Sequence, residues 1–341
     1  MTIGQPGLAG TPGTTPALGT PTLLCEDVVQ EFRIRSRGRR QVVSAVAGVS
    51  FEISRGETFA IVGETGSGKS TLARSIIRAP APRSGRIVVS GRELSGKEAE
   101  QKIGALVQMI FQDPFTALDP KWTVERIVTE PLASRGEAAS MARRRKVAEI
   151  LTRVGLAPSL FAQRQPHELS GGQAQRVAIA RALIGAPSLL ICDEPVTALD
   201  VSIQAQILQL LFDLKSELNL TYLLIAHDLA VVRVLADRTA TMYLGKLFEI
   251  GPTTAMFDAS AHPYTEALLS AIPRRPGAAL VGERIRLRGE PPSPMKPPSG
   301  CRCHTRCNYA QAICVDQVPQ LHEIGPGRTV ACHFPLIGAA S

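Results

Sequence analysis

The stretch GETGSGKST, Gly63 to Thr71, restricts the possible fold of this 341-residue chain more than any other feature. It fits the pattern G-x-x-x-x-G-K-[ST] and lies between an apolar run, FAIV, and a helix-like segment, KSTLARSIIRA. Its glycines let several backbone N–H groups point at phosphate oxygens, and the helix N-terminus adds the positive end of its dipole. Lys69 would reach the β- and γ-phosphates, and the Ser70 hydroxyl would bind Mg²⁺. The sequence therefore predicts a nucleotide-binding loop of Gly63, Glu64, Thr65, Gly66, Ser67, Gly68, Lys69, Ser70 and Thr71.

A second apolar run, LLICDEP, ends in two adjacent carboxylates. The carboxyl ends of parallel strands are where ligands bind in sheets of this kind. Asp193 is placed to hold Mg²⁺, through water, and Glu194 is then free to orient or deprotonate an attacking water. Alone, such a pair is as typical of a structural role as of a catalytic one. Together with the phosphate loop, it indicates a nucleotide hydrolase.

The order of the remaining segments predicts an α/β fold. Strand-like runs such as ETFAIVG, SLLICDEP and TYLLIAHD alternate with helix-like runs such as QAQRVAIARALIG and SIQAQILQLLFDLKSEL. This alternation favours a mainly parallel sheet with helices on both faces. Residues from about 119 to 168 are helix-prone and rich in Arg and Ala. We expect a disordered leader at 1–21, a nucleotide-binding domain at 22–272 and a Pro- and Cys-rich module at 273–341.

The net charge of +8 raises the question of an anionic partner. The densest basic runs, RIRSRGRR and RRRK, also read as a solvated loop and a solvated helix face. Only 4% of the residues are aromatic, which is poor material for stacking on bases, so we expect no nucleic-acid partner. No apolar run is long enough to span a bilayer, and the first residues do not form a signal peptide. These features favour a cytosolic chain with reduced thiols.

The segment LSGGQAQR, Leu169 to Arg176, resembles the signature of ABC ATPases. Three more segments resemble motifs of that family in the same order: FQDP gives Gln112 in the Q-loop, TALD gives the D-loop with Asp200, and IAHD gives His227 as the switch histidine. The resemblance implies a P-loop ABC cassette with a mainly parallel sheet, an antiparallel β part and a helical subdomain at about 119–168. It also implies catalytic roles for Lys69, Gln112, Glu194 and His227, with Mg²⁺ bound by Ser70, Gln112 and Asp193.

In that family, the signature of one subunit contacts ATP bound by the other. The Ser170, Gly171 and Gly172 segment opens a helix whose N-terminus suits a phosphate. The resemblance thus implies ATP sandwiched between two cassettes, with Ser170, Gly171, Gly172, Gln173 and Asp200 contacting it in trans. Only one cassette is present in this chain, so a partner would have to bring the other.

Further segments resemble the ATPase subunits of dipeptide and oligopeptide importers, from about Thr22 to the end of the chain. They are MIFQDPFTALDP, PHELSGGQ, CDEPVTALDVSIQAQIL, GPTTAMFD, HPYTEALLSAIP and GEPPSP followed by PPSGCRCHTRC. GKSTLAR and RIRLRGEPPSP resemble the F-type subunit more than its D-type partner. Two residues depart from the family pattern. Ala174 replaces an Arg behind the phosphate-facing residues, and Asp119 replaces an Asn in the region expected to receive the membrane subunits.

The resemblance implies a motor subunit at the cytoplasmic face of the cell membrane. Its partners would be a D-type ATPase subunit, two integral-membrane permease subunits and, indirectly, an extracytoplasmic solute-binding protein. Nickel and glutathione importers share the subfamily, so the cargo stays open. A soluble, non-transport ABC ATPase is a further alternative, but such proteins usually carry two cassettes or a long coiled-coil insert.

Two features keep alternatives open. Phe32, upstream of the phosphate loop, is either the residue that stacks on adenine or an ordinary core residue. Near the end of the chain, Cys301, Cys307, Cys314 and Cys332 fall where some family members hold a [4Fe–4S] cluster. Zinc or no metal are the alternatives. Cys303 is an additional thiol, either a bystander or a substitute for Cys301.

Overall fold

The computed structural model describes residues 19–36, 39–93, 95–272, 285 and 287–337. Most of the predicted leader, residues 1–18, lies outside the described residues. So does residue 273, where we expected the C-terminal module to begin. Among the described residues, none of the helices combines the length and the apolar character needed to cross a membrane.

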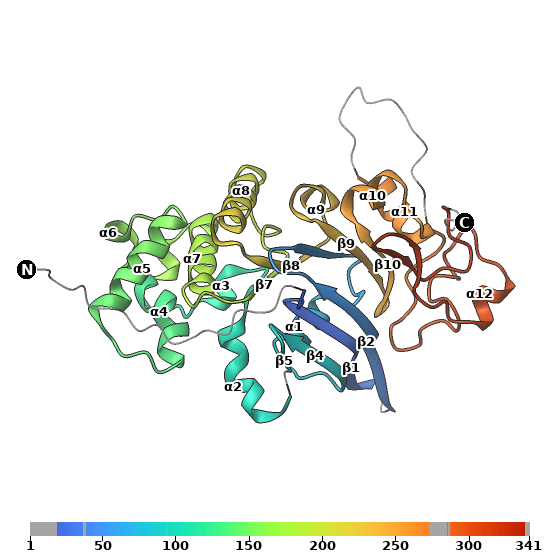
Figure 1. Cartoon of the computed structure of the whole chain (residues 1–341), viewed down its shortest axis with the longest axis horizontal. Helices are drawn as coiled ribbons and strands as arrows, with labels where there is room; N and C mark the ends of the chain where they lie inside the picture. Colours follow the sequence, from blue (N-terminus) through green and yellow to red (C-terminus); the bar gives the residue numbers. More distant parts are fainter. Residues whose placement is uncertain (1–18, 37–38, 94, 273–284, 286, 338–341) are drawn as a thin grey trace, which may run out of the picture.

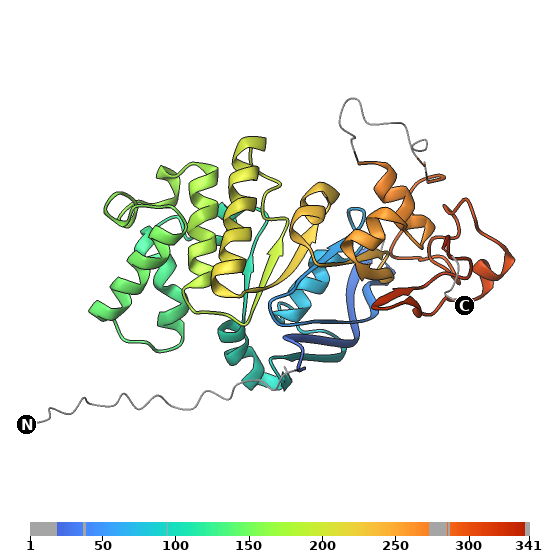
Figure 2. The ribbon, with the colours of Figure 1, turned by 45° about the horizontal axis from the view of Figure 1, so that its top comes forward.

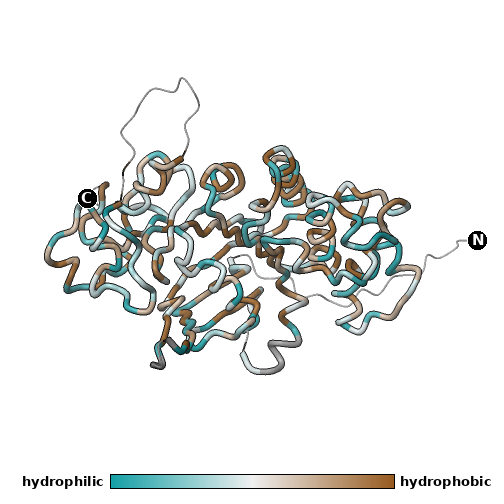
Figure 3. The backbone as a smooth tube through the Cα atoms, turned by 180° about the vertical axis from the view of Figure 1, so that it is seen from behind, coloured by the Kyte–Doolittle hydropathy of each residue, from teal (hydrophilic) through white to brown (hydrophobic). Residues whose placement is uncertain are grey.

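A large mixed sheet forms the centre of the molecule (Figure 1). Its strand order is β11-β12-β10-β9-β3-β8-β7-β6, and the five strands from β9 to β6 run parallel. The central strands are built mainly of aliphatic residues, and the backbone through the middle of the molecule is coloured as hydrophobic in Figure 3. The predicted parallel α/β sheet is therefore confirmed. The bounds are β3 Thr58–Val62, β6 Val107–Ile110, β7 Leu189–Asp193, β8 Thr221–Ala226, β9 Arg238–Tyr243, β10 Lys246–Pro252, β11 His322–Gly325 and β12 Arg328–Val330.

A second, antiparallel sheet packs across helix α1. Its order is β2-β1-β4-β5, with β1 Leu23–Ser36, β2 Arg39–Ile53, β4 Ser84–Val89 and β5 Arg92–Glu93. Helix α1, Lys69–Ile76, contributes the fully buried Leu72 and Ile76 to the core shared by both sheets. The phosphate loop, which immediately precedes α1, is therefore held between two sheets.

Helices α3 to α7 gather beyond the β6 edge of the main sheet, at the left in Figure 2. Several begin at a capping hydroxyl: the Thr123 oxygen accepts from the Arg126 N–H, and the Ser140 oxygen accepts from the Arg143 N–H. A core around α7 joins this helical region to the sheet. The helices are α2 Gly96–Leu106, α3 Pro114–Ala117, α4 Val124–Ser134, α5 Met141–Arg153, α6 Pro158–Phe161, a 3-10 turn at Pro166–Glu168, α7 Gly171–Leu183, α8 Val201–Leu218, α9 Leu229–Leu235, α10 Thr253–Asp258, α11 Pro263–Ser270 and α12 Ala312–Asp316.

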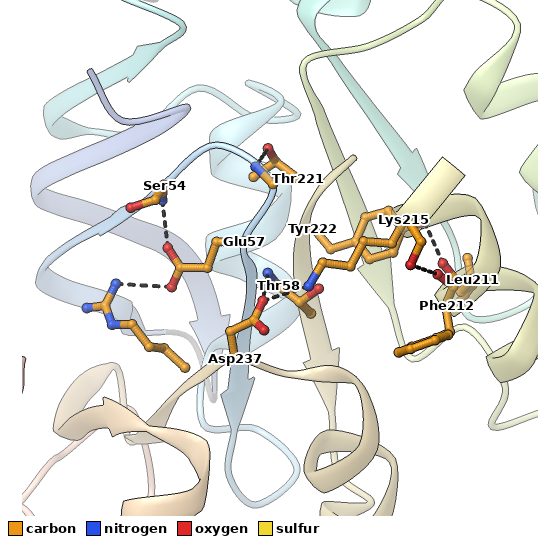
Figure 4. A network of polar contacts seen from close by, with 12 residues as sticks. Ser54, Glu57, Thr58, Leu211, Phe212, Lys215, Thr221, Tyr222 and Asp237 are labelled. Carbon is orange, nitrogen blue, oxygen red and sulfur yellow. Dashed lines mark hydrogen bonds and ion pairs between the residues drawn. The ribbon is translucent and has the colours of Figure 1, made fainter. Parts of the chain in front are cut away.

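A polar network ties together the amino ends of the central strands (Figure 4). The Asp237 Oδ2 atom accepts from the Thr58 N–H at 2.7 Å and from Lys215 Nζ at 2.6 Å. Nearby, the Glu57 carboxylate accepts from the Ser54 N–H at 2.7 Å and pairs with Arg238 at 3.1 Å. These contacts fix the edge of the sheet opposite the phosphate loop, so we interpret them as structural.

The C-terminal segment adds to the same main sheet. Strand β12 pairs with β10, and the Ala331 N–H donates to the Phe248 carbonyl at 2.7 Å. A buried ion pair joins Arg328 to Glu249 at 2.7 Å. The segment after the Pro-rich stretch therefore extends the main sheet of the nucleotide-binding part of the chain, beyond β9 and β10.

Candidate active site

The phosphate loop leaves the carboxyl end of β3 and turns into α1, as its sequence predicts. Gly68 has a φ of 107°, and a Cβ at this position would lie 2.1 Å from the carbonyl oxygen of Ala45. Only glycine therefore fits at this position. The close approach also places the loop directly against strand β2.

Lys69 lies folded across this loop. Its ammonium donates to the carbonyl oxygens of Gly63 at 2.7 Å and Glu64 at 3.0 Å, and to Ser67 Oγ at 3.4 Å. The side chain is 5% exposed. Burial lowers the pKa of the Lys69 ammonium, while the carboxylates of Glu194 and Asp193 act in the opposite direction. An incoming phosphate would stabilise the charged form further.

Asp193 closes the bottom of the site at the end of β7. Its Oδ1 atom accepts a hydrogen bond from Ser70 Oγ at 2.9 Å, so two of the three predicted Mg²⁺ ligands are in contact. Burial raises the pKa of the Asp193 carboxyl, and the Ser70 hydrogen bond opposes that shift. A divalent cation at this position would favour the ionised carboxylate.

Glu194 is the centre of a cluster of donors. Its Oε2 atom lies 3.2 Å from Gln112 Nε2, 3.0 Å from His227 Nδ1 and 3.2 Å from Thr197 Oγ1. Glu194 has a φ of 50°, which is uncommon for a residue other than glycine, and its N–H donates to the Ile225 carbonyl at 3.0 Å. The backbone thus turns sharply after Asp193 and presents the next carboxylate to loops that follow three different strands.

The structure brings together three of the residues that the sequence assigned to catalysis, Gln112, Glu194 and His227. It adds Thr197, the first residue of the TALD motif, which the sequence does not mark as a site residue. Its position three residues after Glu194 was a usable signal, since the chain turns between the two.

The signature segment forms a helix N-terminus, as predicted. Ser170 caps α7: its Oγ accepts from the Gln173 N–H at 3.3 Å, and the Gln173 side chain accepts from the Ser170 N–H at 3.0 Å. Cβ atoms on Gly171 and Gly172 would meet Leu199 and Ile203, at 3.2 and 2.6 Å. The signature therefore packs against the start of α8, where Asp200 is exposed at the N-cap. Among the residues that the structure describes, Ser170–Gln173 makes no hydrogen bond to the phosphate loop.

Phe32 lies on β1 opposite Val43, two residues from Ala45, whose carbonyl lies against Gly68. It is 37% exposed, so the alternative that it is an ordinary core residue is wrong. Its side chain is exposed on strand β1. Contact with adenine stays a prediction.

Four cysteines of the C-terminal segment line one small cavity of about 20 Å³: Cys301, Cys307, Cys314 and Cys332. Burial and the nearby thiols raise the pKa of Cys332 to about 12. Cys303 is not among the residues that line this cavity and is 1% exposed. The described part of the chain contains no group of three or more His, Cys, Asp or Glu that could hold a metal ion. The [4Fe–4S] cluster is therefore not supported by the side chains as they stand.

Comparison with known proteins agrees with this geometry. The family described as "ABC transporter" matches residues 46–197, and "Oligopeptide/dipeptide transporter, C-terminal region" matches residues 248–314. The oligopeptide transport ATP-binding protein AppF of Bacillus subtilis is 49% identical, over 90% of this chain and 95% of that protein. The di/tripeptide transport ATP-binding protein DppF of Pseudomonas aeruginosa is 43% identical, over 91% of this chain and 97% of that protein.

Solved structures show the same cassette fold. A dimeric ATP-binding cassette in a post-hydrolysis state, bound to ADP and Pi, matches with a TM-score of 0.60 and 30% identity, over 68% of this chain and 98% of that one. The cbiO1 protein of Clostridium perfringens, part of the ABC transporter complex cbiONQ, matches with a TM-score of 0.60 and 28% identity, over 70% of this chain and 91% of that one. This chain belongs to the ATP-binding subunits of ABC transporters, in the branch that contains the oligopeptide and dipeptide transport ATP-binding proteins.

Proposed function

We propose that this chain hydrolyses ATP with Glu194 as the general base. The observation that carries the proposal is the position of the Glu194 carboxylate, which follows Asp193 directly and is held by Gln112, Thr197 and His227. A carboxylate held by three donors keeps one orientation, and the neighbouring residue contacts the Ser70 hydroxyl. This is the arrangement that an in-line attack by water requires.

The remaining residues divide the work. Mg²⁺, when bound with ATP, would neutralise charge on the phosphates, and Ser70, Asp193 and Gln112 are the residues that would hold it. The backbone N–H groups of the phosphate loop and the Lys69 ammonium would bind the phosphates. His227 contacts Glu194, so its side chain would lie near the terminal phosphate at which hydrolysis occurs. Phe32 is the candidate for contact with adenine.

Each complete site would need a second cassette. The N-terminus of α7, with Ser170, Gly171, Gly172 and Gln173, is free to face the phosphates of ATP bound to a partner, and Asp200 is exposed beside it. The solved cassette bound to ADP and Pi is dimeric, which supports this assignment. ATP would therefore close two cassettes on each other, and hydrolysis would release them.

The transported substrate is inferred from the relatives. AppF and DppF are named for transport of oligopeptides and of di- and tripeptides, so we propose that this chain drives import of short peptides. Nickel or glutathione as cargo is the alternative. The partners would be a homologous D-type ATPase subunit and two permease subunits, at the cytoplasmic face of the membrane, with a solute-binding protein acting outside. A soluble ABC ATPase without a transporter fits these relatives less well.

We also propose the domain boundaries 22–272 and 273–341, with a [4Fe–4S] cluster in the second part. Its ligands would be Cys301, Cys307, Cys314 and Cys332, which line one cavity while Cys303 does not. Four thiols match such a cluster in number and chemistry. Because no group of described side chains is placed to hold a metal ion, the four side chains would have to close around it.

The substitution Glu194→Gln tests the proposed function. It keeps the size of the side chain and removes the basic carboxylate. Loss of a general base lowers turnover by about 10²–10⁴-fold. We expect the assembled transporter carrying this variant to bind ATP and to accumulate with its two cassettes closed on ATP. It should hydrolyse ATP about 100-fold more slowly than wild type, or slower still. Hydrolysis at the wild-type rate would refute the assignment.

A further inference from the structure

The C-terminal segment reaches the phosphate loop directly. Arg306, which lies between Cys303 and Cys307, donates from Nη1 to Glu64 Oε2 at 2.7 Å. The Glu64 N–H donates to the hydroxyl of Tyr264 at 2.9 Å. Glu64 is the second residue of the phosphate loop. Arg306 and Tyr264, both far from it in the sequence, therefore contact this loop directly.

Arg306 is buried and is held through its Nη1 atom, while its buried Nε atom has no hydrogen-bond partner among the described residues. It is 7% exposed, and its Nη1 atom also lies 3.3 Å from the hydroxyl of Tyr243. Tyr243 and Tyr264 pack with ring centroids 4.7 Å apart. Just after Tyr243, the Gly245 N–H donates to the Ser67 carbonyl at 2.8 Å. The arginine therefore belongs to a packed wall that contacts the phosphate loop at Glu64 and at Ser67.

The charge of Glu64 makes this contact important for nucleotide binding. A loop that receives the phosphates of ATP gains nothing from a carboxylate, because like charges repel. The side chains of Arg306 and Glu64 are 9% and 28% exposed, so solvent screens the pair less than it would an ion pair at the surface. Among the described residues, Arg306 is the only cation that forms an ion pair with Glu64.

The same contact also sets the backbone. The Glu64 carbonyl accepts from Lys69 Nζ at 3.0 Å, while its carboxylate is held by Arg306. We infer that Arg306 is a positioning residue for ATP binding: it neutralises Glu64, draws its carboxylate away from the phosphates and keeps the first turn of the phosphate loop in shape. It acts through Glu64 and does not itself contact the nucleotide in this inference.

The contact links the nucleotide site to the thiols. Arg306 N–H and Cys307 N–H both donate to the Cys303 carbonyl at 2.9 Å, so one tight turn carries the arginine and two cysteines. A change in the conformation of that turn would move the partner of Glu64.

A double-mutant cycle that removes each charge in turn gives the test. In the full-length chain, Arg306→Gln leaves Glu64 uncompensated, Glu64→Gln leaves Arg306 uncompensated, and the double variant restores neutrality. We expect Glu64→Gln to bind ATP most tightly, wild type and the double variant to bind it with similar intermediate affinity, and Arg306→Gln to bind it most weakly. The loss for Arg306→Gln should be about tenfold, the size expected for one unit charge roughly 10 Å from a phosphate charge at an effective dielectric constant of about 20.

The measurement is the Kd of a fluorescent ATP analogue at two ionic strengths, with KM and kcat of the assembled transporter. The loss should appear in Kd and KM and not in kcat, and it should shrink at high salt because the effect is electrostatic. Arg306→Lys keeps the charge and protects the fold. If Arg306→Gln does not fold, Arg306→Lys gives a separate test: because the charge is kept, the loss of ATP affinity should be about threefold or less, and a tenfold loss would contradict the inference.

A purely structural role gives a different pattern. If Arg306 only anchors the C-terminal segment, removing the Glu64 charge as well would not recover the affinity that Arg306→Gln loses. That outcome, or wild-type affinity in Arg306→Gln, would overturn the inference. Recovery of most of the lost affinity in the double variant, together with a salt-dependent loss in the single variant, is the expected result.

Discussion

Thr197→Val should slow ATP hydrolysis without weakening ATP binding. The substitution keeps the shape of the side chain and removes one of the three donors to Glu194 Oε2, at 3.2 Å. A hydrogen bond to a charged group contributes about 1.5–3 kcal/mol, and about 1.4 kcal/mol changes a rate tenfold. Gln112 and His227 still hold the carboxylate, so we expect the lower end of that range, a decrease in kcat of about tenfold.

The assay is steady-state hydrolysis by the assembled transporter, with the Kd for ATP measured separately. Thr197→Ser is the matched control, because it retains the hydroxyl and should keep most of the activity. The reasoning fails if Thr197→Val turns over at the wild-type rate, or if Thr197→Ser is as slow as Thr197→Val. A change in Kd instead of kcat would show that Thr197 supports the phosphate loop and not Glu194.

Two more predictions concern the C-terminal half of the chain. Anaerobically purified protein should be brown with about four irons per chain. Cys307→Ser should lose the colour and Cys303→Ser keep it, whereas zinc, or four free thiols, in metal analysis would contradict the cluster. Burial lowers the pKa of His262 from 6.5 to about 3, so the unfolded chain takes up a proton that the folded chain does not. The free energy of unfolding measured in urea should therefore fall by about 1.4 kcal/mol per pH unit below pH 6.5. His262→Asn keeps an acceptor for the Tyr264 N–H and should not show this decrease. The same dependence of stability on pH in both proteins would disprove the assignment.

The nucleotide-binding motifs were readable from the sequence because each is local. A short apolar strand, a loop and a helix follow one another in the GETGSGKST segment, so the strand and helix fix the loop between them. The same holds for Asp193 and Glu194 at the end of β7. The parallel order of the strands then brings the ends of these segments together without further information.

Phe32 shows where local pattern fails. Alternation of apolar and polar residues predicts the buried face of a strand only if the register is continuous. Strand β1 has register shifts between Cys25 and Val28, between Val28 and Val29 and between Gln30 and Glu31, just before Phe32. Each irregularity changes which side chains face the core, so the exposure of Phe32 could not be deduced from VQEFRI alone.

Contacts between distant segments were beyond the sequence for a different reason. Arg306 and Glu64 are separated by 242 positions, and Arg328 and Glu249 by 79. Nothing in the segments GETGSGKST or GCRCHTRC indicates that one supplies a counter-ion to the other. Only the packing of β12 on β10, and of Tyr264 under the phosphate loop, brings them together.

These long-range contacts change how the C-terminal segment is understood. The sequence suggested an appendage that is organised by its cysteines. In the structure, one of its arginines is the counter-ion of a phosphate-loop carboxylate, and another neutralises Glu249, which is fully buried. Because binding and conformation are thermodynamically linked, any ligand that orders the Cys303–Cys307 turn in the position that holds Arg306 on Glu64 must favour ATP binding, and ATP must favour that order in return. The segment therefore contacts the phosphate loop through Arg306, although that arginine lies outside the nucleotide-binding motifs.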